Sequence, residues 1–427
     1  MGGETDGFGP AVSRGASPPV NPRLRIADPR LEPIAERVLR GERLGLEDGV
    51  VLFETPDLLT VGRLADAVRA RLCGDAVFYN VNRHLNATNL CVAGCKFCAF
   101  ARKEGEEGGW LKTWDEIEGI MRALSPRVTE IHTVNGHHPT LPLDWYEEYL
   151  QRMHAIRPDV HLKAFTAAEI FYFHEISGEP IETVLRRLRT AGLGSLSGGG
   201  CEVLVERVHR KMFPGKCGAA EWLEVHAIAH RLGIPTTATI LFNHIETIEE
   251  RVIHLVRLRE AQDASPGFMA FVPLPFHPDN TFFAKRWRPA TGYAELRMVA
   301  VSRLMLDNFP HVKAYWLTLG TEVAQLALSA GASDIDGTVE EEHIMHMAGS
   351  DAPQLVTESG LRSMIVEAGR VPVERDTIYR PVRREELRGA GVPVRDEADL
   401  DARTELPASL REALRVAWRS EPERAPL

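Results

Sequence analysis

The sequence lacks the features that place a chain in a membrane, outside the cell or on nucleic acid. No apolar run approaches the ~18 residues that a membrane-spanning helix needs. The first twenty residues are rich in Gly, Ser and Pro and lack the apolar segment of a signal peptide. Basic residues are not in excess, and a net charge of −10 without long charged blocks argues against binding to nucleic acid. These absences predict a soluble, cytoplasmic protein with no membrane or nucleic-acid partner.

Cysteine is also scarce. The chain of 427 residues has six cysteines, and their uneven spacing does not indicate a disulfide framework. Three of them are isolated and are expected to be small, buried, apolar side chains: Cys73, Cys201 and Cys217. The other three form one short C-x3-C-x2-C stretch: Cys91, Cys95 and Cys98.

Three thiolates at this spacing can bind one metal centre and leave one coordination position open. We interpret Cys91, Cys95 and Cys98 as ligands of an iron–sulfur cluster, with the open position as the place where chemistry starts. The alternative is a structural zinc site completed by a histidine such as His84, because three cysteines and one histidine are a common zinc ligand set.

Composition and periodicity divide the chain into four parts. Residues 1–30 combine Gly, Pro and Ser without apolar periodicity, and we expect a flexible tail. Residues 31–75 carry apolar residues at helical spacing, which predicts a helical N-terminal extension. Residues 76–382 alternate short β-rich runs with amphipathic stretches. Residues 383–427 are dense in Arg, Glu and Pro and predict a charged C-terminal appendage, with a last helix at Leu406–Trp418.

The alternation in residues 76–382 predicts repeated βα units and a parallel sheet. The expected strands are Val77–Val81, Val128–Val134, Val160–Phe165, Leu193–Leu196, Thr237–Phe242, Gly267–Val272, Val312–Leu317 and, with a weaker pattern, Asp334–Val339. The expected helices are Trp114–Leu124, Asp144–Ile156, Ala168–Ile176, Ile181–Ala191, Ala219–Leu232, Ile248–Gln262, Tyr293–Asn308 and Glu322–Ala330. So many units favour an α/β fold built as a TIM-type (β/α) barrel, complete or partial, over an open doubly wound sheet. Active residues then lie at the carboxyl ends of the strands.

Polar residues and glycines that a simple turn does not require follow the expected strands. They lie in Asn135-Gly136-His137-His138, around Lys163 and Glu169, in Ser197-Gly198-Gly199-Gly200 and in Asn243-His244-Ile245-Glu246-Thr247. Glycines let the backbone approach a ligand closely, and a carboxylate at Glu169 could accept both hydroxyls of a ribose. Each segment also has an ordinary structural interpretation: solvated histidines, a glutamate favoured at a helix start, a plain glycine loop, and Thr247 as a helix cap.

Two further patterns argue against other chemistries. The glycine run at Gly198 lacks the lysine of a phosphate-binding P-loop, which disfavours a nucleoside triphosphate. His226 and His230 stand one helical turn apart without the glutamate of an H-E-x-x-H metal site, so we expect them on a helix surface.

Five segments form a specific set: Cys91–Phe100, Ala164–Glu169, Ser195–Gly200, Arg303–Asn308, and Asp336–Val339 with His346–Gly349. Together they resemble the aminofutalosine synthase family of radical S-adenosylmethionine enzymes, which acts in the futalosine route to menaquinone. The similarity runs from about Leu31 to Tyr379. Dehypoxanthine futalosine cyclase and the tyrosine-using subunit of deazaflavin synthase share the cluster and the barrel and stay as alternatives, although the last segment favours the first family.

The chain departs from this family at three positions. Asn135 precedes Gly136 where the family has a second glycine, Ser197 stands where the family has proline, and Asn243 stands where it has glycine. The first and the third lie where the family contacts S-adenosylmethionine. A side chain at these two positions is therefore expected to crowd the cofactor.

The resemblance implies a [4Fe–4S] cluster on Cys91, Cys95 and Cys98, whose fourth iron binds S-adenosylmethionine. It implies a 5′-deoxyadenosyl radical that adds to 3-[(1-carboxyvinyl)oxy]benzoate and gives 6-amino-6-deoxyfutalosine with loss of bicarbonate. An electron donor such as a flavodoxin or ferredoxin is the implied partner. The residues expected to bind the cofactor are Asn135, Gly136, Glu169, Gly198, Gly199, Gly200, Arg207, His244 and Glu246.

A substrate with two carboxylates in an acidic protein needs buried basic partners. We expect these, and the catalytic roles, at Lys163, His137, His138 and His161, with Arg207 as a further basic candidate. Two hypotheses from other classes are a zinc-dependent binding module and an iron–sulfur electron carrier. The chain is far longer than a carrier needs, which favours an enzyme.

Overall fold

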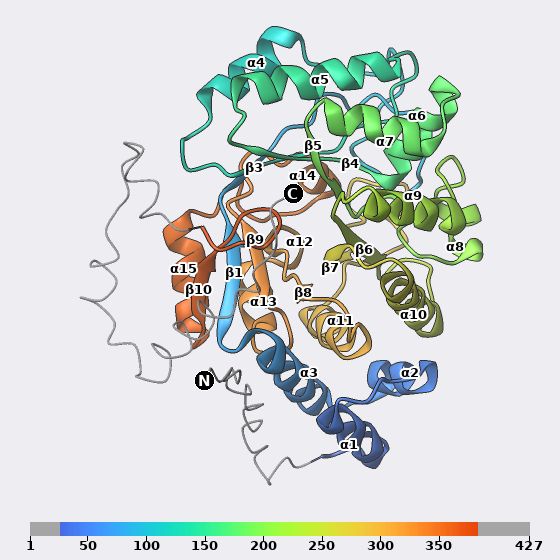
Figure 1. Ribbon diagram of the computed structural model, residues 1–427. Coiled ribbons are helices and arrows are strands. Elements are labelled where there is room, and N and C mark those ends of the chain that lie inside the picture. Colours follow the sequence, from blue (N-terminus) through green and yellow to red (C-terminus); the bar gives the residue numbers. More distant parts are fainter. Residues whose placement is uncertain (1–25, 383–427) are drawn as a thin grey trace, which may run out of the picture.

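The computed structural model describes residues 26–382, and shows a curled parallel sheet surrounded by helices (Figure 1). Seven strands form one parallel sheet in the order β2-β3-β4-β5-β6-β7-β8, and three more form a sheet in the order β10-β1-β9. Single bridges join the two sheets at both edges, between Arg83 and Glu340 and between Lys313 and Asp334. The expected α/β barrel architecture is confirmed.

The strands are short, and most lie close to their predicted positions. Their bounds are β1 (Ala76–Asn80), β2 (Asn82–His84), β3 (Glu130–Thr133), β4 (His161–Thr166), β5 (Leu193–Ser197), β6 (Thr236–Phe242), β7 (Phe268–Pro275), β8 (His311–Val312), β9 (Asp334–Gly337) and β10 (Val371–Glu374). The expected strand Val312–Leu317 is wrong over most of its length, because β8 ends at Val312, only the bridge at Lys313 follows it, and the chain then turns into α12 (Trp316–Leu319). A short buried apolar run fits a strand and a buried helix equally well.

Helices cover the outside of the curled sheet (Figure 1). Their bounds are α4 (Trp114–Ala123), α5 (Leu143–Ile156), α6 (Ala167–Ser177), α7 (Ile181–Thr190), α8 (Glu206–Met212), α9 (Ala219–Arg231), α10 (Ile248–Ala264), α11 (Gly292–Met305), α13 (Thr321–Ala327), α14 (Ile344–Ala348) and α15 (Glu358–Glu367). Within residues 26–382, no helix is both long and apolar enough to cross a membrane.

Three of these helices begin with the same local device. In the sequence Thr-x-x-Glu, the threonine hydroxyl accepts the backbone N–H of the glutamate, and the glutamate carboxylate accepts the backbone N–H of the threonine. The pairs are Thr113 with Glu116 in α4, Thr166 with Glu169 in α6, and Thr247 with Glu250 in α10. The prediction that Thr247 caps a helix is confirmed.

The N-terminal extension is helical, as predicted. It consists of a 3-10 turn (Pro29–Leu31) followed by α1 (Glu32–Arg40), α2 (Leu46–Glu54) and α3 (Leu58–Cys73), and α3 packs against α11. Asp28 caps the first turn by accepting the N–H of Arg30, so regular structure begins slightly before the predicted boundary at residue 30. Most of the expected tail, and all of the expected appendage, lie outside the described residues, and the four-part division stays a prediction.

The sheet presents an apolar face to the helices and a polar face to the inside of the barrel. Outward residues such as Ile131, Leu162 and Ile240 belong to the buried apolar core. The inward positions carry polar or charged side chains: Glu130, His132, His161, Lys163, Ser195, Ser197, Thr237, Thr239, Asp334 and Asp336. A polar interior requires internal pairing or a polar ligand, because an unpaired buried polar group is costly.

Candidate active site

A cavity of about 270 Å³ lies where the inward side chains meet the ends of the strands. The three cysteines of the C-x3-C-x2-C stretch line it. Other residues that line it come from several strand ends: Asn135, Gly136, His137, Lys163, Glu169, Gly199 and Gly200. The structure therefore brings the three cysteines together with seven of the other residues predicted to form the site.

The cysteine loop is held in place by backbone hydrogen bonds. Cys91 N–H donates to the carbonyl of Arg102 at 2.9 Å, and Val92 N–H donates to the carbonyl of His137 at 2.9 Å. Gly94 has φ of +62°, a left-handed conformation that favours glycine. The second bond ties the loop to the segment after β3, so that the cysteines share the cavity with Asn135 and Gly136.

The thiols lie in apolar surroundings. Phe97 lines the cavity beside them, and its ring packs edge-on against Phe213, with the ring centres 6.1 Å apart. Burial raises the pKa of the Cys95 thiol to about 12, against the opposing effect of the nearby Lys216 ammonium. Burial also raises the pKa of Cys98. Because metal ligands must be deprotonated, binding of a metal centre there releases protons.

The donor set fits a cluster of several irons better than one zinc ion. Three soft sulfur ligands line one wall, as an iron–sulfur cluster requires. His84, the histidine of the zinc alternative, instead places its Nε2 3.2 Å from Nδ1 of His132.

Asn135 uses its side chain inside the protein. Its Oδ1 accepts the N–H of Ala87 at 2.6 Å, and its own N–H donates to Oε1 of Glu169 at 2.9 Å. Its Nδ2 is buried and has no hydrogen-bond partner among the described residues. At Gly136 a Cβ would lie 2.2 Å from the carbonyl oxygen of Leu90, so close packing requires glycine there.

Glu169 has both carboxylate oxygens engaged by the backbone. Oε2 accepts the N–H of Thr166 at 2.8 Å, and Oε1 accepts the N–H of Asn135. Burial raises the pKa of Glu169 to about 7, although these donors favour the charged form. The carboxylate thus joins the start of α6 to the loop after β3, and the predicted contact with a ribose stays a prediction.

The glycine run is shaped by its neighbours. A Cβ at Gly198 would lie 2.7 Å from the backbone of Thr237 on β6, and one at Gly200 would lie 2.7 Å from Cβ of Ala168 on α6. Gly200 also has φ of +107°. The backbone at Gly199 and Gly200 therefore borders the cavity with no side chain between it and a ligand.

A second group of side chains lines the cavity from the strands of the barrel. Nε2 of His132 lies 2.9 Å from Oγ of Ser197, and Nδ1 of the same ring faces His84. Burial, together with the positive charge of Lys163, moves the pKa of His132 well below its ordinary value. Both rings are therefore neutral at pH 7, because burial also lowers the pKa of His84.

Two lysines line the cavity, and they differ in their partners. Nζ of Lys216 lies 2.8 Å from Oε1 of Glu202. Lys163 is 6% exposed, and its side-chain Nζ has no hydrogen bond or ion pair with any residue in 26–382, although its backbone pairs within the sheet. Burial and the neighbouring Lys313 lower the pKa of Lys163. An unpaired buried ammonium at a cavity wall is a binding group for an anion.

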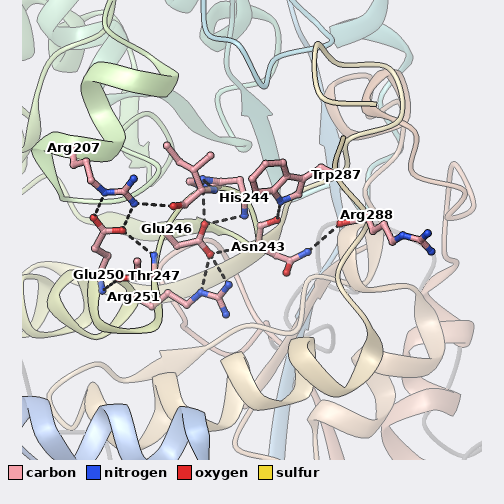
Figure 2. Close-up of polar contacts among 10 residues, drawn as sticks. Arg207, Asn243, His244, Glu246, Thr247, Glu250, Arg251, Trp287 and Arg288 are labelled. Atoms are coloured by element: carbon pink, nitrogen blue, oxygen red, sulfur yellow. Dashed lines mark hydrogen bonds and ion pairs between the residues drawn. The ribbon is translucent and has the colours of Figure 1, made fainter. Parts of the chain in front are cut away.

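Six of the predicted residues do not line the cavity. His161 places Nε2 2.9 Å from Oγ of Ser195 at the start of β4, and Nδ1 of His138 accepts the N–H of Thr140. Gly198 packs against β6, as described above. The other three belong to a polar network in which Arg207 on α8 meets His244 and Glu246 of the loop before α10 (Figure 2). The roles predicted for these six stay predictions.

Figure 2 shows how that network uses its charges. Arg207 pairs with Glu250, with an N–O distance of 2.5 Å, and also donates to the carbonyl of Ile245. Glu246 accepts the N–H groups of Asn243 and His244 and pairs with Arg251 at 2.7 Å. These carboxylates shape the loop itself.

The structure corrects two further expectations and adds residues. His226 is buried, not on a helix surface, because its ring packs against Trp222 and Phe268 and its Nδ1 lies 3.0 Å from Oγ1 of Thr236. Of the isolated cysteines, Cys201 and Cys217 are buried as expected, whereas Cys73 is only partly buried. Residues of the cavity that were not predicted include His132, Glu202, Lys216, Thr237, Thr239, Tyr315, Asp336 and Glu342.

Comparison with known proteins places the chain in a class. Residues 85–258 match the Radical SAM superfamily, and residues 265–386 match the CofH/MqnC C-terminal region. The fold is similar to that of methylornithine synthase (PylB), with a TM-score of 0.64 and 17% identity over 83% of this chain and 99% of that one. The maturase HydG from Carboxydothermus hydrogenoformans gives a TM-score of 0.62 with 16% identity, over 82% and 81% of the two chains. The fold and the three cysteines thus define a radical S-adenosylmethionine enzyme, a class that uses a [4Fe–4S] cluster and S-adenosylmethionine.

The relatives narrow the class to a family. The chain is 49% identical to aminodeoxyfutalosine synthase of Thermus thermophilus, over 84% of this chain and 97% of the relative. It is 42% identical to the protein of the same name from Streptomyces coelicolor, over 82% and 93%. It is 37% identical to 5-amino-6-(D-ribitylamino)uracil--L-tyrosine 4-hydroxyphenyl transferase 1 of Methanosarcina barkeri, over 84% and 96%. The chain belongs to the aminodeoxyfutalosine synthase family.

Proposed function

We propose that this protein is an aminodeoxyfutalosine synthase, which joins the 5′-deoxyadenosyl group of S-adenosylmethionine to 3-[(1-carboxyvinyl)oxy]benzoate. The observation that carries the proposal is the 49% identity to the Thermus thermophilus enzyme over 97% of that protein. The cavity supports it, because it places three cysteines and one unpaired cation around the same space.

Cys91, Cys95 and Cys98 are the residues that would hold the cluster. With S-adenosylmethionine bound, a reduced [4Fe–4S] cluster supplies a 5′-deoxyadenosyl radical by one-electron cleavage of the sulfonium. The backbone at Gly136, Gly199 and Gly200 borders the same space, and there a cofactor meets no side chain.

Lys163 is our candidate partner for a substrate carboxylate. The substrate carries two carboxylates, and a carboxylate beside Nζ completes a charge-assisted hydrogen bond that the protein leaves unmade. The nearby ammonium and guanidinium groups are already paired: Lys313 with Asp336 at 3.2 Å and Arg375 with Asp334 at 2.6 Å. Among these buried cations, Lys163 is the one free to bind a ligand.

The rest of the cavity is suited to positioning and to excluding water. Apolar side chains line one side: Phe97, Phe100, Leu241, Val272, Leu274 and Phe276. The neutral rings of His84 and His132 and the hydroxyls of Thr237 and Thr239 line another. A radical reaction gains most from holding two carbons close together and keeping solvent out, and these are the tasks we assign to this lining.

The test is a substrate comparison with the full chain, reconstituted anaerobically with iron and sulfide. S-adenosylmethionine and dithionite are combined with the enolpyruvyl benzoate, with dehypoxanthine futalosine, or with tyrosine plus 5-amino-6-(D-ribitylamino)uracil. The expected result is 6-amino-6-deoxyfutalosine, detected by mass spectrometry, in the first mixture alone. The third mixture is included because of the 37% identity to the uracil-tyrosine transferase, and a product there would replace the proposal.

A further inference from the structure

A groove of about 860 Å³ lies between α9 and α10 on the outside of the barrel (Figure 1). Both helices pack on β6, and the residues that line the groove are distinct from those that line the active-site cavity. Alanines line the groove from both sides: Ala220 and Ala227 on α9, and Ala261 and Ala264 on α10. Because these side chains are short, they leave the space between the two helices unfilled.

The groove is largely apolar, but it contains a buried polar atom that has no partner. Leu223 and Phe268 line the groove, and so does His226, which is 1% exposed. Nε2 of His226 has no hydrogen-bond partner within residues 26–382. Since an unpaired buried polar atom is costly, the groove is suited to an apolar group that also offers one hydrogen bond.

The neighbouring hydrogen bonds decide which kind of bond His226 can make. Nδ1 of His230 lies 2.7 Å from the carbonyl oxygen of Ser265, so this nitrogen carries the hydrogen. Nε2 of His230 therefore accepts from the Thr236 hydroxyl at 2.8 Å, and the hydroxyl oxygen accepts from Nδ1 of His226 at 3.0 Å. Both rings are neutral, because burial lowers the pKa of each histidine. Nε2 of His226 is thus an acceptor, and its missing partner is a donor.

Carboxylates dominate the charged residues of the groove. Four glutamates and one arginine line it: Glu206, Glu221, Glu224, Glu260 and Arg257. Glu221, Glu224 and Glu260 have no ion pair within the described residues, whereas Glu206 is in contact with Arg210 at 3.3 Å. The groove therefore has a net negative charge and favours a cationic ligand.

A segment outside the described residues has the matching pattern. The predicted helix at Leu406–Trp418, here called the tail segment, has apolar residues at the spacing i, i+3, i+4, i+7 and i+8: Leu410, Ala413, Leu414, Ala417 and Trp418. Arg411 and Arg415 are one helical turn apart, beside this apolar stripe. Ser409 and Glu412 match the Thr-x-x-Glu caps described above, so the carboxylate of the tail segment is expected to be engaged at a helix start.

Trp418 supplies what the groove lacks. An indole is a large apolar ring whose Nε1–H can only donate, and Nε2 of His226 can only accept. Tryptophan is also a common anchor in apolar pockets at protein interfaces. Arg411 and Arg415 in turn carry the charge that Glu221 and Glu224 attract.

The tail segment can reach the groove. The described residues end at Val382, three positions after Tyr379, whose ring stacks on His311 of β8 with the ring centres 3.8 Å apart. β8 pairs with β7, and the first residue of β7, Phe268, lines the groove. This path is on the order of 30 Å, whereas residues 383–405 can span up to about 80 Å when extended. A tethered segment is present at a high effective concentration, so even a modest affinity keeps it bound.

We propose that the groove between α9 and α10 is the docking site for the chain's own tail segment, which binds there as an amphipathic helix. Its apolar stripe covers the alanines and Phe268, Trp418 donates to Nε2 of His226, and the arginines lie over the acidic rim. The match to the CofH/MqnC C-terminal region ends at residue 386, so this contact goes beyond the proposed function and does not depend on it.

The experiment maps the contact by photo-crosslinking in the full chain. Benzoylphenylalanine is introduced at Leu414, on the apolar stripe, or at Val416, on the opposite side of the predicted helix. Crosslinked peptides are identified by mass spectrometry, in a mixture of isotope-labelled and unlabelled chains that separates contacts within a chain from contacts between chains. Position 414 should crosslink within the chain to residues 219–231 or 257–268, and position 416 should give much less of this product.

A charge-reversal variant tests the role of the arginines. Arg411→Glu with Arg415→Glu should lower the crosslink yield from position 414 roughly three- to thirtyfold, because two partly exposed ion pairs are lost. The matched control, Arg384→Glu with Arg388→Glu, makes the same change of charge outside the tail segment and should leave the yield unchanged.

Exchange of the charges tests the acidic rim. Combining the first variant with Glu221→Arg and Glu224→Arg should restore the crosslink, because the pairs form again with their signs exchanged. If this combination does not fold, as circular dichroism would show, Glu260→Arg on α10 provides the same test. The proposal is overturned by crosslinks to another surface, by crosslinks between chains alone, by equal yields from positions 414 and 416, or by the absence of any crosslink.

Discussion

Replacing Lys163 with methionine tests how the cavity recognises its substrate. The side chain is 6% exposed and unpaired within residues 26–382, so methionine keeps the length of the side chain and removes the charge. One charge-assisted hydrogen bond contributes about 1.5–3 kcal/mol. The Michaelis constant for the enolpyruvyl benzoate should therefore rise roughly 10- to 100-fold, because each 1.4 kcal/mol is tenfold. The assay is steady-state product formation by mass spectrometry with dithionite as reductant.

The stability of the same variant gives an independent check. Burial lowers the pKa of Lys163 below its ordinary value near 10.4. At pH values between the pKa of Lys163 in the folded chain and its pKa in the unfolded chain, the unfolded chain binds more protons. The charged lysine therefore destabilises the fold at neutral pH, and this destabilisation decreases as the pH rises. Lys163→Met removes the burial cost of the ammonium but also a positive charge that holds the pKa of the buried Glu130 carboxylate low, so it should lower the melting temperature at pH 7 less than loss of a paired buried lysine does.

The matched control is Lys313→Met. Lys313 is also buried inside the barrel, but it pairs with Asp336 at 3.2 Å. Removing one partner of a buried pair costs about 3–5 kcal/mol, since the other charge is left behind. Lys313→Met should therefore lower the melting temperature by several degrees. The reasoning about Lys163 is refuted if its variant binds substrate normally, or if it is destabilised as much as Lys313→Met.

Three further predictions follow from other parts of the structure. Cys95→Ala should abolish the iron–sulfur absorbance and product formation, while circular dichroism shows that the chain stays folded. The control variant Cys201→Ala should retain the cluster. Normal iron–sulfur absorbance in Cys95→Ala would contradict the assignment of Cys95 as a ligand. Thr247→Ala removes a helix cap and should cost about 0.5–2 kcal/mol in urea unfolding, so an unchanged midpoint would show that the cap adds nothing. The Glu342 carboxylate raises the pKa of His346 to about 8. Protonated His346 therefore stabilises the fold fully below its ordinary pKa near 6.5, and this stabilisation is lost as the pH rises through 8. The melting temperature of His346→Gln should depend less on pH across this interval than that of the unmodified protein.

The cysteine ligands could be predicted from the sequence because their spacing is local. Three cysteines within eight residues meet in space whatever the rest of the chain does, and the glycines at 136, 199 and 200 follow strands whose apolar pattern is clear. The barrel could be predicted for the same reason, since its βα units repeat. Strand β8 was misjudged because a buried apolar run has no periodicity to separate strand from helix.

The interior of the cavity was only partly predictable. His132 and Ser197 lie in the middle or at the last residue of strands, and they meet across the barrel through strand pairing, which no local pattern records. The sequence did contain a pattern that indicates these residues, because polar and apolar residues alternate within these strands. Such alternation predicts that the polar side chains share one face of the sheet. Arg207 shows a second limit: its charge suggested a ligand contact, but the sequence does not reveal that Glu250 on α10 pairs with it.

The charged interior of the barrel limits how this chain can diverge. A mutation at Asp334, Asp336, Lys313 or Arg375 leaves its ion-pair partner as an unpaired buried charge. A new substrate preference gained at these positions would therefore require two mutations at once. The side chains of Ser197, Thr237 and Thr239 carry no charge and line the cavity. A single substitution at one of these positions should therefore cost less stability than one in an ion pair. Diversification among related enzymes should accordingly concentrate at the hydroxyl positions, with the ion pairs inherited as units.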